Sequence, residues 1–211
     1  MEIEQHQREG LNATTSARDL ERLCQADGRT IRNETIKPHE DLTIPNVPRL
    51  RAVDFMFVEK ALPHFKAITR DYFYQPLESS FNWDETAERL GLDKEGTWFI
   101  VAFRSVRRAD ACGKTLYQAD AQAHQEAIES GGLLKYWYGT LDDQRQCLAM
   151  CIWSNREFAR VATVKPLHIQ AVSLTRRMYV SYTLERYQLI KRKGVAHFEI
   201  QSLGECCRTV A

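Results

Sequence analysis

Two histidines of this chain stand where a titratable side chain could move a proton. His124 lies on the apolar stripe of a segment with helical spacing, and His168 follows Pro166 in a second such segment. An imidazole changes its charge near neutral pH, so either residue could act as a general acid or base. Because a proline ring removes a backbone donor and bends a helix, His168 is the first titratable group after a bend that opens space. His168 is therefore the first candidate, whereas packing in the core is the competing interpretation of His124.

Tyrosines in apolar surroundings are the second kind of candidate. Tyr136 and Tyr138 share one face of a predicted strand. A phenol in an apolar pocket can donate a hydrogen bond to a developing enolate or oxyanion, and the competing interpretation is cross-strand packing. We expect Tyr138 to support His168 in catalysis. The expected ligand-binding residues are Tyr136, Trp153, Phe103 and Tyr182.

One arginine interrupts an otherwise apolar strand. Arg104 lies in the segment 98–106, both faces of which are mostly apolar. A buried guanidinium needs a partner. That partner is either a structural carboxylate such as Glu185 or the anionic group of a substrate. In the second case Arg104 belongs to the catalytic set with His168.

Several familiar catalytic and cofactor signatures are missing from the sequence. It contains no glycine-rich phosphate loop, no G-x-S-x-G and no H-E-x-x-H, which disfavours nucleotide hydrolysis, Rossmann-type hydride transfer, serine hydrolysis and zinc proteolysis. The six cysteines form no C-x-x-C pair and have no histidine at zinc spacing. We therefore expect neither a metal nor a cofactor.

The elements that must position these side chains fall within residues 97–194. Four segments are rich in β-branched and aromatic residues, and two have helical spacing. The polar turn 142–144 is short, so it permits a hairpin and excludes a parallel crossover. The resulting order of strand, helix, strand, strand, helix, strand predicts an α+β fold with a ferredoxin-like core, in which two helices cover one face of a four-stranded antiparallel sheet. The expected strands are residues 98–106, 133–141, 146–153 and 182–191.

Local signals mark where the two helices begin. Thr115 with Gln118, and Ser154 with Glu157, match the capping box, in which two side chains satisfy free backbone donors of the first turn. Pro166 is expected to kink or split the second helix.

Composition divides the rest of the chain. The first residues are polar and rich in proline, which predicts a partly disordered arm with a short helix over residues 17–26. The next stretch carries many aromatic residues, so we expect it to pack on the core as a helical or irregular extension. After the core, residues 197–200 could add a short strand. The four parts are an arm (1–49), an extension (50–96), the ferredoxin-like core (97–194) and a C-terminal tail (195–211).

The composition also bounds the partners. The chain has 211 residues, is 44% hydrophobic and has a net charge of +1, from 29 basic and 28 acidic residues. Nucleic-acid binding needs a concentrated basic face, and no such excess exists here. No apolar run reaches the length of a membrane span, and the N-terminus lacks a secretory signal pattern, so we expect a cytoplasmic protein.

Element order and junctions point to a known group of folds. The capped Trp153–Ser154 junction, the kinked second helix and the long last strand resemble the dimeric α+β barrel superfamily, which includes antibiotic-biosynthesis monooxygenases and small polyketide cyclases. The resemblance implies a homodimer that holds a small, mostly apolar ligand between sheet and helices, often without metal or cofactor. Over residues 81–84 and 97–193 the chain also resembles a fungal family with no known activity.

Three functional hypotheses are compatible with these observations. The first is a cofactor-independent cyclase or isomerase acting on a polyketide or terpenoid intermediate, in which an apolar pocket folds the substrate and a His/Tyr/Arg set moves a proton. The second is a monooxygenase on the same scaffold, using O₂ with an activated substrate or a haem. The third is a non-catalytic module for ligand binding or dimerisation.

Overall fold

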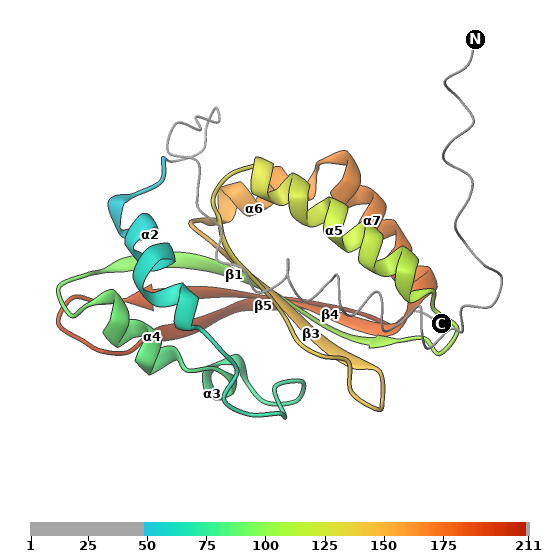
Figure 1. Cartoon of the computed structure of the whole chain (residues 1–211), viewed down its shortest axis with the longest axis horizontal. Coiled ribbons are helices and arrows are strands. Elements are labelled where there is room, and N and C mark those ends of the chain that lie inside the picture. The colour runs from blue at the N-terminus through green and yellow to red at the C-terminus, as the bar shows by residue number, and fades with distance from the viewer. Residues whose placement is uncertain (1–48, 210–211) are drawn as a thin grey trace, which may run out of the picture.

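A five-stranded antiparallel sheet forms the middle of the molecule (Figure 1). The computed structural model describes the backbone of residues 49–209 and the side chains of residues 49–204; the helix and the disorder predicted for the N-terminal arm lie outside the described residues. The spatial order β2-β3-β1-β4-β5 places β1 at the centre, as its two apolar faces predict. The strands are β1 (Gly96–Arg107), β2 (Leu133–Tyr138), β3 (Gln146–Trp153), β4 (Tyr179–Lys191) and β5 (Glu199–Thr209).

The first four strands and their helices have the predicted βαββαβ order, so the α+β, ferredoxin-like fold class is confirmed. The number of strands is a correction. Residues 199–209, expected to lie mostly in a tail, pair with β4 along its length. The fifth strand satisfies the backbone groups that β4 would otherwise expose at a sheet edge.

Three helices cover one face of the sheet: α5 (Gly113–Glu129), α6 (Arg156–Thr163) and α7 (Pro166–Met178). Pro166 splits the second predicted helix into α6 and α7, one of the two outcomes expected of it. It is the first residue of α7, where the donor that proline lacks has no intrahelical acceptor.

Both helix caps differ from the predicted ones. The N-cap of α5 is Cys112, three residues before Thr115, and the Thr115 hydroxyl lies 3.2 Å from the Cys112 Sγ. The N-cap of α6 is Asn155 instead of Ser154, and its Oδ1 accepts hydrogen bonds of 2.9 and 3.1 Å from the second and third backbone N–H groups of α6. Asparagine in an extended conformation is as good a cap as serine, so the motif alone could not choose between the neighbours.

Residues 52–90 cover the opposite face of the sheet, on the side away from α5, α6 and α7 (Figure 1). Their aromatic side chains form one cluster with Trp98, Ile100 and Leu189, which share that face. The N-cap of α4 is Asn82. The short elements are α2 (Ala52–Met56), a π-helical turn (Phe57–Ala61), a 3-10 turn (Leu62–His64), α3 (Leu77–Ser80) and α4 (Trp83–Leu90).

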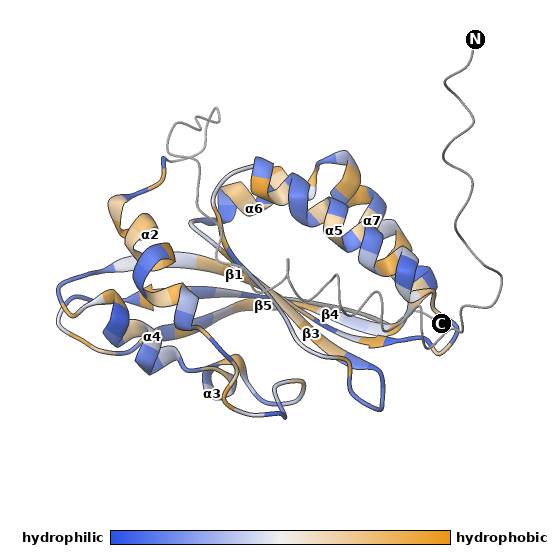
Figure 2. Cartoon of the chain, viewed as in Figure 1, coloured by the Kyte–Doolittle hydropathy of each residue, from blue (hydrophilic) through white to orange (hydrophobic). Residues whose placement is uncertain are grey.

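Hydropathy follows this layering. In Figure 2 the strands carry hydrophobic residues through the middle of the sheet, whereas the loop between β2 and β3 is hydrophilic. None of the helices in residues 49–209 is long and apolar enough to cross a membrane. Within the same residues, no group of three histidine, cysteine or acidic side chains is arranged to hold a metal ion.

Candidate functional site

Polar and aromatic side chains gather between the sheet and helices α5 and α7. Every second residue of β1 from Phe99 to Arg107 faces these helices, and so do the cross-strand partners of those residues. The arrangement is unusual for a core because titratable groups replace aliphatic ones toward one end. We call this group the interlayer cluster, and it comprises Arg107, Tyr117, Asp120, His124, Tyr136, Tyr138, Cys151, His168 and Tyr179.

Asp120 and Tyr136 form the shortest described contact of the cluster. The Tyr136 hydroxyl donates to the Asp120 Oδ1 at 2.7 Å. The His124 ring lies 4.8 Å from the Tyr136 ring, centroid to centroid. Burial raises the pKa of Tyr136 well above its usual value, and the charge of Asp120 raises it further. Tyr136 therefore stays protonated and acts as a hydrogen-bond donor, not as a base.

His168 enters the cluster from the first turn of α7. Its backbone N–H donates to the Glu126 Oε2 at 2.9 Å, so a carboxylate from α5 caps the start of α7. Its Nδ1 is buried and has no hydrogen-bond partner among the described residues. Burial lowers the pKa of His168, while Glu126 and Asp120 oppose that shift. A neutral imidazole with an unused nitrogen can accept a proton.

Tyr138 lies two residues beyond Tyr136 in β2, on the same face of the sheet. Burial raises its pKa well above the usual value, and Cys147 and Tyr117 contribute to that shift. The Tyr117 and Tyr138 rings are 6.5 Å apart in an edge-on arrangement. Tyr138 thus stays protonated in the same aromatic environment as the rest of the cluster.

The predicted ligand-binding residues all lie on the helix-facing side of the sheet. Trp153 is 3% exposed and packs with Phe99 and Phe158, so it forms a wall at the α6 end. The Phe103 and Tyr182 rings are 5.3 Å apart, at the other end of the layer. Their use by a ligand stays a prediction.

Arg104 lies on the opposite face of the sheet and cannot share a site with His168. Its Nε donates to Glu185 at 2.8 Å, which is the structural carboxylate that the sequence suggested. Its Nη1 and Nη2 atoms donate to the carbonyl oxygens of Tyr72, Phe73 and Gln75 at 2.6, 2.6 and 2.9 Å. These bonds hold the loop before α3 on the sheet, so the placement of Arg104 in the catalytic set is corrected.

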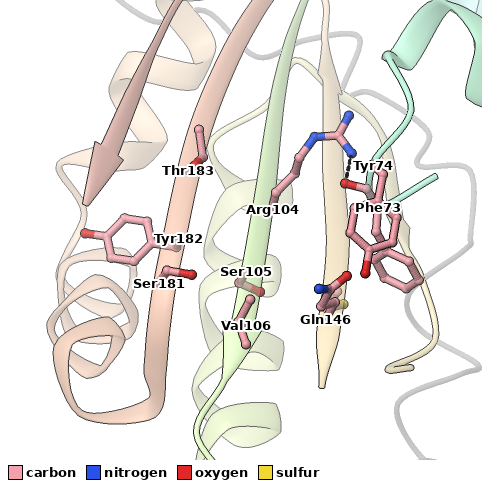
Figure 3. Close-up of a pocket in the computed structure, with 10 residues that line it drawn as sticks. Phe73, Tyr74, Arg104, Ser105, Val106, Gln146, Ser181, Tyr182 and Thr183 are labelled. Atoms are coloured by element: carbon pink, nitrogen blue, oxygen red, sulfur yellow. Dashed lines mark hydrogen bonds between the residues drawn. The ribbon is translucent and has the colours of Figure 1, made fainter. Parts of the chain in front are cut away.

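A hollow lies on this opposite face, beside Arg104 (Figure 3). It has a volume of about 160 Å³ and opens to solvent. Figure 3 shows Phe73 and Tyr74 at one side of it and strands β1 and β4 beneath it. The guanidinium of Arg104 is engaged by protein atoms, and the other polar side chains that line the hollow include Ser181 and Gln146. The hollow has no charged group available for chemistry.

Sequence reasoning did not propose five members of the interlayer cluster as functional residues: Arg107, Tyr117, Asp120, Cys151 and Tyr179. Asp120 precedes His124 by four residues, which places both on one face of a helix, and that spacing could have found it. Arg107 continues the alternation of β1 one residue beyond the predicted strand end. Tyr179 lies before the predicted strand start at residue 182, because β4 begins three residues earlier than predicted.

The lowered pKa of His168 predicts how stability depends on pH. Below about pH 6.5 the unfolded chain takes up a proton on His168 more readily than the folded chain. The free energy of unfolding therefore falls as the pH falls toward and through the pKa of His168 in the folded protein. We expect His168→Gln to lose less stability than the wild type between pH 7.5 and 5. Urea unfolding at a series of pH values measures both slopes. Identical slopes would contradict the burial of a neutral imidazole.

The fold and the cluster define a ferredoxin-like α+β protein with a polar, aromatic layer between its sheet and helices. The chain belongs to the PB2B2.08-like family, whose model matches residues 43–202. It is 36% identical over 112 residues to the UPF0643 protein PB2B2.08 of Schizosaccharomyces pombe. That alignment covers 50% of this chain and 51% of the relative, so it spans about half the length of the curated protein.

Two solved structures have a similar core. A protein from Shewanella oneidensis aligns with a TM-score of 0.41 and 12% identity, over 47% of this chain and 98% of its own. SnoaB, a cofactor-independent oxygenase from Streptomyces nogalater, aligns with a TM-score of 0.36 and 13% identity, over 46% of this chain and 94% of its own. Both alignments cover slightly less than half of this chain.

Proposed function

We propose that this chain is a cofactor-independent enzyme of cyclase or isomerase type, acting on an apolar carbonyl compound such as a polyketide or terpenoid intermediate. The observation that carries the proposal is the buried Nδ1 of His168, which has no partner among residues 49–204 and lies in a layer that also holds the Asp120–Tyr136 pair. A buried polar atom without a partner is rare in native proteins and indicates a use. The aromatic side chains of the layer suit an apolar substrate.

The proposed chemistry needs only proton transfer. His168 accepts a proton from the carbon next to a substrate carbonyl, so the C–H bond breaks and its electrons form an enolate. Tyr138, which stays protonated, donates a hydrogen bond to the enolate oxygen. The imidazolium then returns its proton. In an isomerase it protonates another carbon, and in a cyclase it protonates the alkoxide formed when the enolate carbon attacks a second carbonyl.

Two residues support the electrostatics of that step. Asp120 and Glu126 both raise the pKa of His168, so their negative charges favour the imidazolium that forms during proton transfer. Burial acts in the opposite direction and keeps the resting imidazole neutral. The balance of the two suits a base that must gain a proton and then release it. His124, packed on Tyr136, is the second candidate for moving a proton.

Deuterium exchange tests the proton-transfer step without knowledge of the natural substrate. In D₂O, with 4-phenylbutan-2-one and an aliphatic 1,3-diketone as probes, we expect the protein to accelerate deuterium uptake next to the carbonyl at least roughly 100-fold over buffer, the lower end of what general base catalysis contributes. NMR follows the exchange. His197→Ala is the matched control, since His197 is exposed.

The same experiment separates the alternatives. No acceleration with either probe would overturn the enzyme proposal in favour of a binding module. Consumption of O₂ by the protein and an activated probe, followed with an oxygen electrode, would favour the monooxygenase and overturn the isomerase.

A homodimer is the second part of the proposal. Residues 52–90 cover the sheet face opposite the helices, with Trp98 and Leu189 buried beneath them. A dimer that pairs these sheet faces would have to displace this extension. We therefore expect any homodimer to use another surface, and light scattering at micromolar concentration gives the oligomeric state. A mass of two chains that falls to one on substitution of Tyr74, an exposed residue of the extension itself, would contradict that expectation.

A further inference from the structure

Arg107 is a buried cation at the end of β1. Its side chain faces α5, and the residue is 5% exposed. The guanidinium stays protonated in proteins, so its charge cannot be relieved by losing a proton. Burying such a charge is costly unless a counter-charge and hydrogen bonds compensate it.

The described residues supply hydrogen bonding and ring contact but no counter-charge. The Arg107 Nη2 donates to the Tyr117 hydroxyl at 2.8 Å, and the guanidinium carbon lies 4.9 Å from the centre of the Tyr117 ring. No carboxylate in residues 49–204 forms an ion pair with it. Two arginines nearby in the sequence differ in this respect, because Arg104 pairs with Glu185 and Arg108 with Asp110.

The surroundings of Arg107 add positive potential. A methyl group on Gly113, the first residue of α5, would lie 3.5 Å from the Arg107 Nη1, so the guanidinium sits beside the N-terminus of a 17-residue helix. A helix N-terminus carries a partial positive charge. Two positive sources therefore meet at one end of the interlayer cluster, and both favour an anion.

The same end of the cluster is in electrostatic contact with the acid–base group. Burial raises the pKa of Tyr179, Asp120 raises it as well, and Arg107 lowers it. The pKa of the Tyr179 phenol is therefore shifted both by the Asp120 carboxylate, which is bonded to Tyr136, and by the Arg107 guanidinium. The aromatic side chains around Arg107 include Tyr117, Tyr138 and Tyr179.

We propose that Arg107 binds the carboxylate of a small ligand with an aromatic or apolar body that lies in the interlayer cluster. A guanidinium fork matches the two oxygens of a carboxylate, and the rings suit the ligand's body. The site names a substrate class for the proposed function, on which it rests: a carbonyl compound that also bears a carboxylate. The ligand supplies the counter-charge that the described residues lack.

Matched ligands test the assignment by binding alone. Isothermal titration compares 4-phenylbutanoate with 4-phenylbutanamide, which has the same body and no charge. We expect the wild type to bind the carboxylate at least roughly tenfold more tightly, because a charged hydrogen bond to a buried arginine is lost with the amide. Arg107→Gln should abolish the preference. Arg108→Gln, which changes the neighbouring exposed arginine, should keep it.

The outcomes are distinguishable from those of the proton-transfer experiment. Equal binding of acid and amide by the wild type, or a preference that survives Arg107→Gln, overturns the carboxylate site. If Arg107→Gln does not fold, the same two ligands are titrated into Tyr117→Phe and compared with the wild type. The Tyr117 hydroxyl holds the guanidinium, so its loss should weaken the preference for the carboxylate. A carboxylate preference without deuterium exchange would overturn the catalytic proposal alone. Exchange on neutral ketones without a preference would overturn this site alone.

Discussion

Replacing His168 by alanine is expected to lower enzyme-catalysed deuterium exchange by roughly 100-fold or more, the lower end of what a positioned general base contributes. The melting temperature should change little. The contact that anchors the start of α7 uses the backbone N–H of His168, which alanine keeps. The Nδ1 lost with the side chain has no partner among the described residues, so its removal breaks no described hydrogen bond.

The control is His197→Ala, since both substitutions remove an imidazole but His197 is exposed. It should leave both exchange and melting temperature unchanged. A large loss of stability in His168→Ala with exchange at the wild-type rate would show that His168 is a core histidine. That result would remove it from the site.

Replacing Arg104 by methionine is expected to lower the free energy of unfolding by about 3 kcal/mol, as for breaking a largely buried ion pair. The Glu185 side chain is 13% exposed, and among the described residues the substitution leaves it only the hydrogen bond from the Tyr187 hydroxyl at 2.9 Å. It also removes the donors to three backbone carbonyls in the loop before α3. Each unsatisfied buried group adds to the cost.

The control for Arg104→Met is Arg89→Met. Arg89 forms an exposed pair with Glu85 one helical turn away, which contributes less than about 0.5 kcal/mol. Urea unfolding gives both values. Because Arg104 lies on the face away from the interlayer cluster, exchange activity at a temperature where the variant is folded should equal that of the wild type. A stable Arg104→Met protein without activity would return Arg104 to the catalytic set.

Local patterns in the sequence were sufficient for the element order and the fold class. The apolar run of β1, the short turn between β2 and β3 and the proline at α7 each act over a few residues. Such signals involve backbone hydrogen bonds and side-chain spacing within one element, so they need no knowledge of distant parts. The exact first residues of the helices did not follow from these signals. The predicted caps are Thr115 and Ser154, whereas the N-caps in the structure are Cys112 and Asn155.

The fifth strand shows where local patterns fail. Residues 199–209 are largely polar, and their strand conformation depends on pairing with the open edge of β4. Strand propensity reflects such neighbours more than the segment itself. The chain therefore carried only a weak signal, at residues 197–200, for a strand that runs eleven residues.

The composition of the candidate site also needed the tertiary structure. The sequence determined that Arg104 and Phe103 point to opposite faces of β1, because successive side chains of a strand alternate. It did not determine which face meets α5 and α7 and which meets the aromatic extension, since both faces are apolar. Asp120 meets Tyr136, and Glu126 meets the backbone of His168 across 42 residues, only because two apolar layers cover the sheet from opposite sides. Burial of both faces at once is a property of the whole chain, and it placed Arg104 in a structural role and left His168 and Arg107 in the interlayer cluster.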